Sequence, residues 1–317
     1  MFRSPIIRNA SVGRSFLFLC ILTLPFMEAG CQRKSTSAKA EGRPAFVLPD
    51  IPSELRTKED RLDYMTRHYW DRFDFRDTAY IHLPDITEQA IVDYIDLLRD
   101  LTRMRREDCV ASMLGKASAE PLMLRYFTDV LHEYWANPRS PFYEATFYEP
   151  VARYILSSPH FDEASKSKAA FELKMSRMNS EGSVANDFTC VLSSGMEQRM
   201  SEIDTPCLLL FFYDPDCHSC QHLFSQIKSS ERLKELVAGK KIKVLAMYPS
   251  DDAEAWKRYG DSVPDTWLNG YDRDLSIQNN LLYNLVKMPS LYILDSRKRV
   301  LKKDVDIRGL ADFLDKL

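Results

Sequence analysis

Two cysteines separated by two residues, Cys217 and Cys220, are the residues of this chain whose type and spacing best fit chemistry. They follow an apolar run and an acidic turn in the segment LLLFFYDPDCHSCQHLF (residues 208–224). Such a pair can act as a redox-active dithiol, supply two ligands to a metal site, or close a structural disulfide. The elements around the pair decide among these three kinds of site.

The pair stands between an expected buried strand and an expected helix, which favours redox chemistry. A helix N-terminus presents free N–H groups and the positive end of the helix dipole, and both favour a thiolate. The thiolate is the reactive form of cysteine. Two intervening residues place the second sulfur within one helical turn of the first, so that it can resolve a mixed disulfide.

Charges next to the pair act in opposite directions. The helix end and a protonated His218 favour the anionic form of Cys217, whereas Asp214 and Asp216 oppose it, and each exposed charge contributes about 0.3–1 kcal/mol. We expect Asp216, His218 and the intervening Ser219 to modulate the site. Because these charges nearly balance, we expect a reductase or isomerase more than a strong oxidant.

The first thirty residues have the composition of a signal peptide. Three arginines precede the apolar stretch SFLFLCILTLPFM (15–27), and small residues in EAGC (28–31) precede Cys31. The apolar stretch is short for a membrane span and typical of an export signal. We expect residues 1–30 to be removed and the chain to reach the periplasm or cell envelope, where disulfide chemistry is permitted.

Small residues followed by Cys31 resemble a bacterial lipoprotein signal. The resemblance implies that Cys31 becomes the lipidated N-terminal residue, which would anchor the protein to a membrane. Cleavage near Gly30 to give an unanchored exported protein is the alternative. Residues 31–49 are polar and contain Pro and Gly, and we interpret them as a tether.

Composition excludes several classes of function. The formal net charge is -3, which gives no basis for nucleic-acid binding, and no glycine-rich phosphate loop is present. We therefore expect no nucleic-acid partner and no cofactor. The cysteines Cys109, Cys190 and Cys207 stand in apolar surroundings and are expected to be inert buried thiols.

Residues 50–180 show the spacing of an all-helical region with about five helices. Ile91, Tyr94, Ile95 and Leu98, for example, recur at intervals of three and four residues. The aromatic-rich stretch 126–154 is interpreted as helix core, with a groove for client proteins as the alternative. The role of this domain stays open, and a client-binding or docking module is one hypothesis.

Residues 181–317 alternate between strand-like and helix-like patterns, which indicates a mixed sheet with helices on its faces. We interpret WLNGYDRD (267–274) as a loop near the active site. Pro289 stands directly before the last buried strand and is a candidate for a cis peptide bond beside an extended substrate. The expected strands are 187–194, 205–214, 241–250, 289–296 and the edge strand 298–304, and the expected helices are 217–237, 252–260, 274–285 and 307–317.

The segments GSVANDFTCVLSSGMEQRM, LLLFFYDPDCHSC and MPSLYILDSRKRVL resemble the membrane-anchored, thioredoxin-like thiol–disulfide oxidoreductases of bacteria. With the helical region, the chain resembles Bacteroidetes-type lipoproteins that carry a helical domain of unknown function ahead of a thioredoxin fold. The resemblance implies that Cys217 is the nucleophile, Cys220 the resolving cysteine and Pro289 the cis proline. It also implies client proteins with disulfides and a membrane-bound electron donor as partners.

Three positions depart from the family pattern. Asp216 stands where most of the superfamily has Trp, and Met288 stands before the proline where Thr, Val or Ile is common. Phe211 stands where thioredoxins bury an acidic proton acceptor. These departures leave open how the proton of Cys220 is removed and in which redox direction the pair works.

Two further functions remain as alternatives. One is a thioredoxin-fold binding scaffold whose thiols do not turn over. The other is a copper- or zinc-binding lipoprotein that uses the C-x-x-C-x-H pattern of Cys217, Cys220 and His222, because soft thiolates and imidazole suit those metals. No second CxxC pair completes such a metal site in the sequence.

Overall fold

The computed structural model of the chain describes residues 45–317. The expected signal peptide (1–30), the lipidation site Cys31 and most of the tether (31–49) lie outside the described residues. In the described part, no helix is both long and apolar enough to cross a membrane. The architecture confirms the expected fold class, helices followed by a mixed sheet with flanking helices.

The N-terminal part is built of helices alone. Two of them, α2 and α4, begin at a proline, which suits the first helical position because the missing N–H has no intrahelical partner there. The count is one α-helix more than expected. The helices are α1 (Lys58–His68), α2 (Pro84–Arg99), α3 (Arg103–Ala117), α4 (Pro121–Trp135), α5 (Ala145–Ser157) and α6 (Glu163–Arg177), with a 3-10 helix η1 (Thr78–His82).

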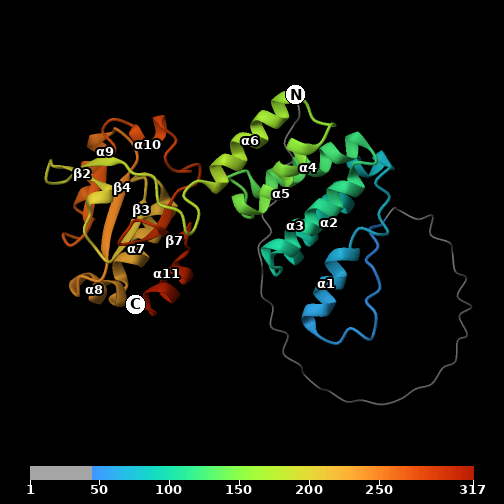
Figure 1. Cartoon of the computed structure of the whole chain (residues 1–317), viewed down its shortest axis with the longest axis horizontal. Helices are drawn as coiled ribbons and strands as arrows, with labels where there is room; N and C mark the ends of the chain where they lie inside the picture. The colour runs from blue at the N-terminus through green and yellow to red at the C-terminus, as the bar shows by residue number, and fades with distance from the viewer. Residues whose placement is uncertain (1–44) are drawn as a thin grey trace, which may run out of the picture. The chain divides into compact units, whose positions relative to one another are not determined.

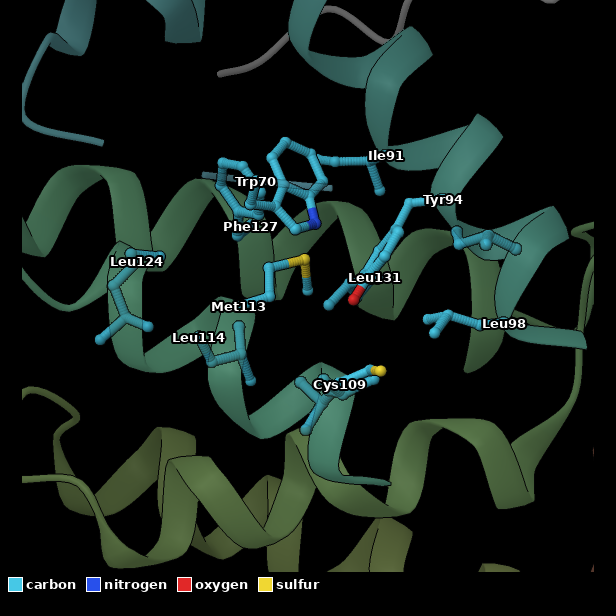
Figure 2. Packing of buried hydrophobic residues seen from close by; sticks show 14 of the residues in the cluster. Trp70, Ile91, Tyr94, Leu98, Cys109, Met113, Leu114, Leu124, Phe127 and Leu131 are labelled. Atoms are coloured by element: carbon cyan, nitrogen blue, oxygen red, sulfur yellow. The ribbon is translucent and has the colours of Figure 1, made fainter. Parts of the chain in front are cut away.

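Aromatic side chains fill the core of the helical part. Trp70 and Phe127 lie together between the helices, with their ring centroids 5.1 Å apart, and Met113 lies beside them (Figure 2). Edge-to-face pairs of this kind add stability beyond the apolar area they bury. Within the stretch 126–154, Trp135 and Tyr148 are also buried, which supports the interpretation of this stretch as core.

The C-terminal part of the chain forms a sheet with helices around it (Figure 1). The sheet has seven strands in the order β2-β1-β5-β4-β3-β6-β7. The strands β3, β4 and β5 are parallel, while β6 and β7 at one end and β1 and β2 at the other run antiparallel to their neighbours. The strands are β1 (Thr189–Leu192), β2 (Glu197–Arg199), β3 (Cys207–Phe212), β4 (Lys243–Tyr248), β5 (Leu268–Tyr271), β6 (Ser290–Asp295) and β7 (Val300–Lys303).

Both faces of the sheet are covered, so the central strand β3 is apolar throughout. Leu209 and Phe211 point into the core under α7, α8, α9 and α11, whereas Leu208 and Phe212 point into the core under residues 185–203. The helices that flank the sheet are α7 (His218–Ser229), α8 (Glu231–Ala238), α9 (Ala253–Gly260), α10 (Ser276–Asn279) and α11 (Ile307–Leu314).

The interpretation of residues 267–274 as a loop was wrong. Leu268–Tyr271 forms β5, paired with β4 on one side and β1 on the other, and Trp267 is buried in the core. The strand contains Asn269 and Gly270, two residue types that strands disfavour, so its sequence pattern is weak. The glycine has a structural reason, because a Cβ at position 270 would come within 2.8 Å of Cys190 Sγ.

Two expected helices are shorter than their sequence patterns. The helix expected over 217–237 is interrupted at Ser230, whose hydroxyl accepts the N–H of Leu233 and caps the separate helix α8. The helix expected over 274–285 is reduced to α10, because Leu281 adopts a left-handed backbone with φ 49°. Local capping and backbone geometry therefore override the helical period at both places.

Candidate active site

The pair Cys217 and Cys220 lies at the start of α7, immediately beyond the carboxyl end of β3. Cys217 is the N-cap residue, with extended backbone, and its sulfur accepts the N–H of Cys220 at 3.3 Å. This hydrogen bond satisfies one of the amides that the first helical turn leaves free. The sequence-predicted helix start at the CxxC pair therefore corresponds to the observed N-terminus of α7.

The two sulfurs differ in exposure. Cys217 is half-buried, whereas Cys220 is only 1% exposed. Burial raises the pKa of the Cys220 thiol, and the hydrogen bond with Cys217 raises it further. Cys220 is therefore a protonated thiol at neutral pH, and Cys217 is the sulfur that an incoming molecule reaches.

Strand pairing brings Met288 and Pro289 to the same place. Because Ser290 of β6 pairs with Phe212 of β3, the residues before β6 lie beside the turn that follows β3. The Cys217 thiol donates to the Met288 carbonyl oxygen across 3.9 Å, and the Met288–Pro289 peptide bond is cis. Strand pairing thus brings together predicted site residues that are about 70 positions apart in the chain, Cys217 on one side and Met288 with Pro289 on the other.

The turn ahead of the pair is held by its own hydrogen bonds. The Asp214 carboxylate accepts the N–H of Asp216 at 2.9 Å, and Gln221 Nε2 donates to the Pro215 carbonyl oxygen at 2.7 Å. Asp216, His218 and Ser219, the residues next to Cys217 in the chain, are exposed. The residues that flank Cys217 are therefore polar, with an acidic side chain at position 216.

No carboxyl group occupies the buried position beneath Cys220. Phe211 is fully buried there, with its ring 5.8 Å from Tyr213 and 6.2 Å from Phe224. The sequence analysis did not identify Tyr259 of α9, whose ring lies 5.3 Å from both Tyr213 and Phe224. Burial raises the pKa of the Tyr259 hydroxyl, and the nearby Cys220 adds to the shift.

Below the site, a buried amide joins three elements. The Asn269 Oδ1 of β5 accepts hydrogen bonds from the Tyr213 hydroxyl at 3.1 Å and from the Trp256 indole N–H at 2.8 Å. A buried polar group of this kind is stable only because its partners are in place. The arrangement fixes the end of β3, from which the turn to Cys217 starts.

The metal-binding alternative has no support in the described residues. Between residues 45 and 317, no group of three or more His, Cys, Asp or Glu side chains is placed to hold a metal ion. His218 and His222 are exposed on α7. The C-x-x-C-x-H pattern therefore does not converge on a common centre.

The chain is similar to known proteins over both of its parts. A family described as a domain of unknown function (DUF5106) matches residues 27–179. A thioredoxin-like protein from Bacteroides caccae, known from a crystal structure, is 32% identical in sequence to this chain. The match covers 87% of this chain and 99% of that chain, and the two structures superpose with a TM-score of 0.81. The chain belongs to this thioredoxin-like family. The family resemblance seen in the sequence is thereby confirmed.

Two further solved structures match only the C-terminal part of this thioredoxin-like protein. The C-terminal domain of an uncharacterised protein from Bacteroides fragilis is 36% identical and covers 43% of this chain and 98% of its own, with a TM-score of 0.42. The thioredoxin domain of a thiol-disulfide oxidoreductase from Bacteroides vulgatus is 19% identical, with coverages of 43% and 96% and a TM-score of 0.38. No curated protein matches the chain.

Proposed function

We propose that the protein is a thiol–disulfide oxidoreductase that exchanges electrons with disulfides of client proteins. One observation carries the proposal. The accessible Cys217 sulfur lies at the start of α7, and the buried Cys220 thiol follows within the same helical turn. This arrangement separates the roles of attacking and resolving cysteine by exposure alone.

The reaction moves two electrons from the protein to the client. The Cys217 thiolate attacks one sulfur of the client disulfide, the client S–S bond breaks, and the leaving sulfur takes up a proton. Cys220 then loses its proton and attacks the Cys217 sulfur of the mixed disulfide. The second client sulfur leaves as a thiol, and the protein is left with a Cys217–Cys220 disulfide.

Net reduction or isomerisation of clients is the direction that we propose. A strong oxidant needs a highly stabilised reduced anion at the attacking cysteine, and the acidic side chains Asp214 and Asp216 next to Cys217 oppose such an anion. Equilibration with glutathione buffers measures the redox potential of the pair. A value near about -270 mV supports the direction, and a value near about -120 mV contradicts it.

The proposal places the protein in the cell envelope, attached through a lipid on Cys31 and supplied with electrons by a membrane-bound dithiol donor. The sequence of residues 1–31 supports this location, because it combines a positive start, an apolar stretch and small residues before the cysteine. A donor is required by the stoichiometry, since each client reduction leaves the pair oxidised.

A trapping experiment tests the exchange chemistry. In Cys220→Ala, Cys217 still attacks a client disulfide but nothing resolves the product, so mixed disulfides with envelope proteins should accumulate on non-reducing gels. The matched variant Cys217→Ala should trap nothing, because the remaining sulfur is buried. Absence of mixed disulfides in Cys220→Ala would favour the binding scaffold whose thiols do not turn over.

A further inference from the structure

We propose that the helical part supplies one wall of the client-binding cleft, and that Tyr143 on this wall selects clients with an apolar side chain near the reacting cysteine. The proposal rests on the proposed function, since it names the chemistry of the client. It also gives the helical part a role in recognition.

A cleft of about 400 Å³ lies beside the redox pair. Its lining includes Tyr143, in the connection between α4 and α5, together with Leu223 of α7 and Pro289. Val305 and Ile307, just beyond β7, continue the apolar lining. The cleft is therefore built from segments of both the helical part and the sheet part of the chain.

One tripeptide connects the cleft to the reacting sulfur. The Met288 carbonyl oxygen lies 3.9 Å from Cys217 Sγ, and the next residue, Pro289, lines the cleft. The preceding residue, Lys287, places its ammonium 5.1 Å from the centroid of the Tyr143 ring. Because a chain advances about 3.3 Å per residue when extended, residues next to a client cysteine at Cys217 reach this cleft.

Hydrogen bonds hold the helical wall against the sheet. Lys303 Nζ, at the end of β7, donates to the carbonyl oxygens of Ser176 and Met178 at 2.9 and 2.8 Å. Asn179 Nδ2 donates to the Leu282 carbonyl oxygen at 2.9 Å. These bonds fix the C-terminal end of α6, and a wall that is ordered before binding lowers the entropic cost of binding.

The chemistry of the cleft favours an apolar occupant. Its charged groups have both signs, with Glu144, Asp304 and Asp306 opposed by Lys287 and Lys303, so neither sign dominates the lining. The Asp304 carboxylate is already engaged, because it accepts a hydrogen bond from the Ser290 hydroxyl at 2.7 Å. An aromatic ring facing aliphatic side chains is the feature that discriminates, and it suits a large apolar side chain.

The proposal is tested with the protein and the disulfides of two peptides that differ at one position. Two short cysteine peptides, one with Phe and one with Ser two residues from the cysteine, are each presented as the disulfide with 2-mercaptoethanol. Bis(2-hydroxyethyl) disulfide serves as a control probe, because a molecule this small does not extend from Cys217 into the cleft. Thiol release by the fully reduced protein gives the second-order rate constant for each.

We expect the wild-type protein to reduce the Phe peptide roughly ten-fold faster than the Ser peptide, the scale on which an apolar pocket discriminates. Tyr143→Ala should remove most of this preference, and Tyr143→Phe should keep it. Tyr64→Ala, a half-buried tyrosine of the helical part that is not among the residues lining the cleft, should behave as wild type. All four proteins should reduce the small disulfide equally.

Equal rates for the two peptides with the wild-type protein would overturn the proposal, as would a preference that survives in Tyr143→Ala. Faster reduction of both peptides by Tyr143→Ala would also overturn it, since the wall would then exclude clients. If the wild-type protein reduces the small disulfide no faster than Cys217→Ser does, the proposed function itself fails. Activity on the small disulfide without peptide preference removes only the assignment of the cleft.

Discussion

Cys217→Ser is expected to lower the rate of disulfide reduction by about three orders of magnitude or more, to the uncatalysed background. A serine hydroxyl stays protonated at neutral pH and does not form the covalent bond to sulfur that the reaction requires. Cys217 is also the one cysteine among residues 45–317 that is not buried. Single-turnover reduction of insulin by the reduced protein measures the rate.

Cys109→Ala is the matched control for this loss. It also removes one thiol, but from the core of the helical part, where burial raises the pKa of Cys109 and keeps it unreactive. The rate should stay within a factor of about two of wild type, since distant sites act independently. Retention of a tenth or more of the activity in Cys217→Ser would assign the reaction to another group.

Trp70→Ala is expected to lower the free energy of unfolding by about 3–5 kcal/mol, the range for removing a buried aromatic side chain. Trp70 is 3% exposed, so its truncation to alanine would leave a cavity in the core. Urea denaturation followed by circular dichroism measures the change. The centroid of the Trp70 ring lies 5.1–5.8 Å from the ring centroids of Phe46, Tyr69, Phe73, Phe75, Tyr94 and Phe127.

Trp70→Phe distinguishes the loss of ring packing from the removal of the buried indole N–H donor. The Trp70 indole N–H is buried and has no acceptor among the described residues, and an unpaired buried donor costs about 1–3 kcal/mol. Phenylalanine removes this donor while keeping an apolar ring, so we expect a loss well below that of the alanine variant. Equal losses in both variants would contradict this expectation, because they would show that the smaller phenyl ring recovers none of the packing of the indole.

The helical character of the N-terminal part could be predicted because the signal for a helix is local. Apolar residues at intervals of three and four, such as Ile91, Tyr94, Ile95 and Leu98, became the buried face of α2. The sequence signal for the site was partly local as well, since the strand, the turn and the helix start around Cys217 are continuous in the sequence. The position of Pro289 directly before a buried strand made it a candidate for a cis peptide bond, and the family resemblance implied the same role.

Strand β5 could not be predicted from the local sequence pattern, because the pattern does not show which strands will pair. Its four residues include Asn269 and Gly270, and the strand exists because β4 and β1 already offer partners on both sides. Propensity is a weak guide to strands, since the stabilising pairs come from other segments. The same reason explains why Tyr259 and Asn269 were not recognised as parts of the site.

The sequence by itself determined the helical character of the N-terminal part, the helix start at the CxxC pair and the apolar strand before it, because these depend on neighbours within one or two turns of the chain. Only the tertiary structure decided that Cys220 is buried while Cys217 is accessible, and that Tyr143 faces the segment before β6. Both depend on contacts between residues far apart in the chain, and no spacing rule encodes them.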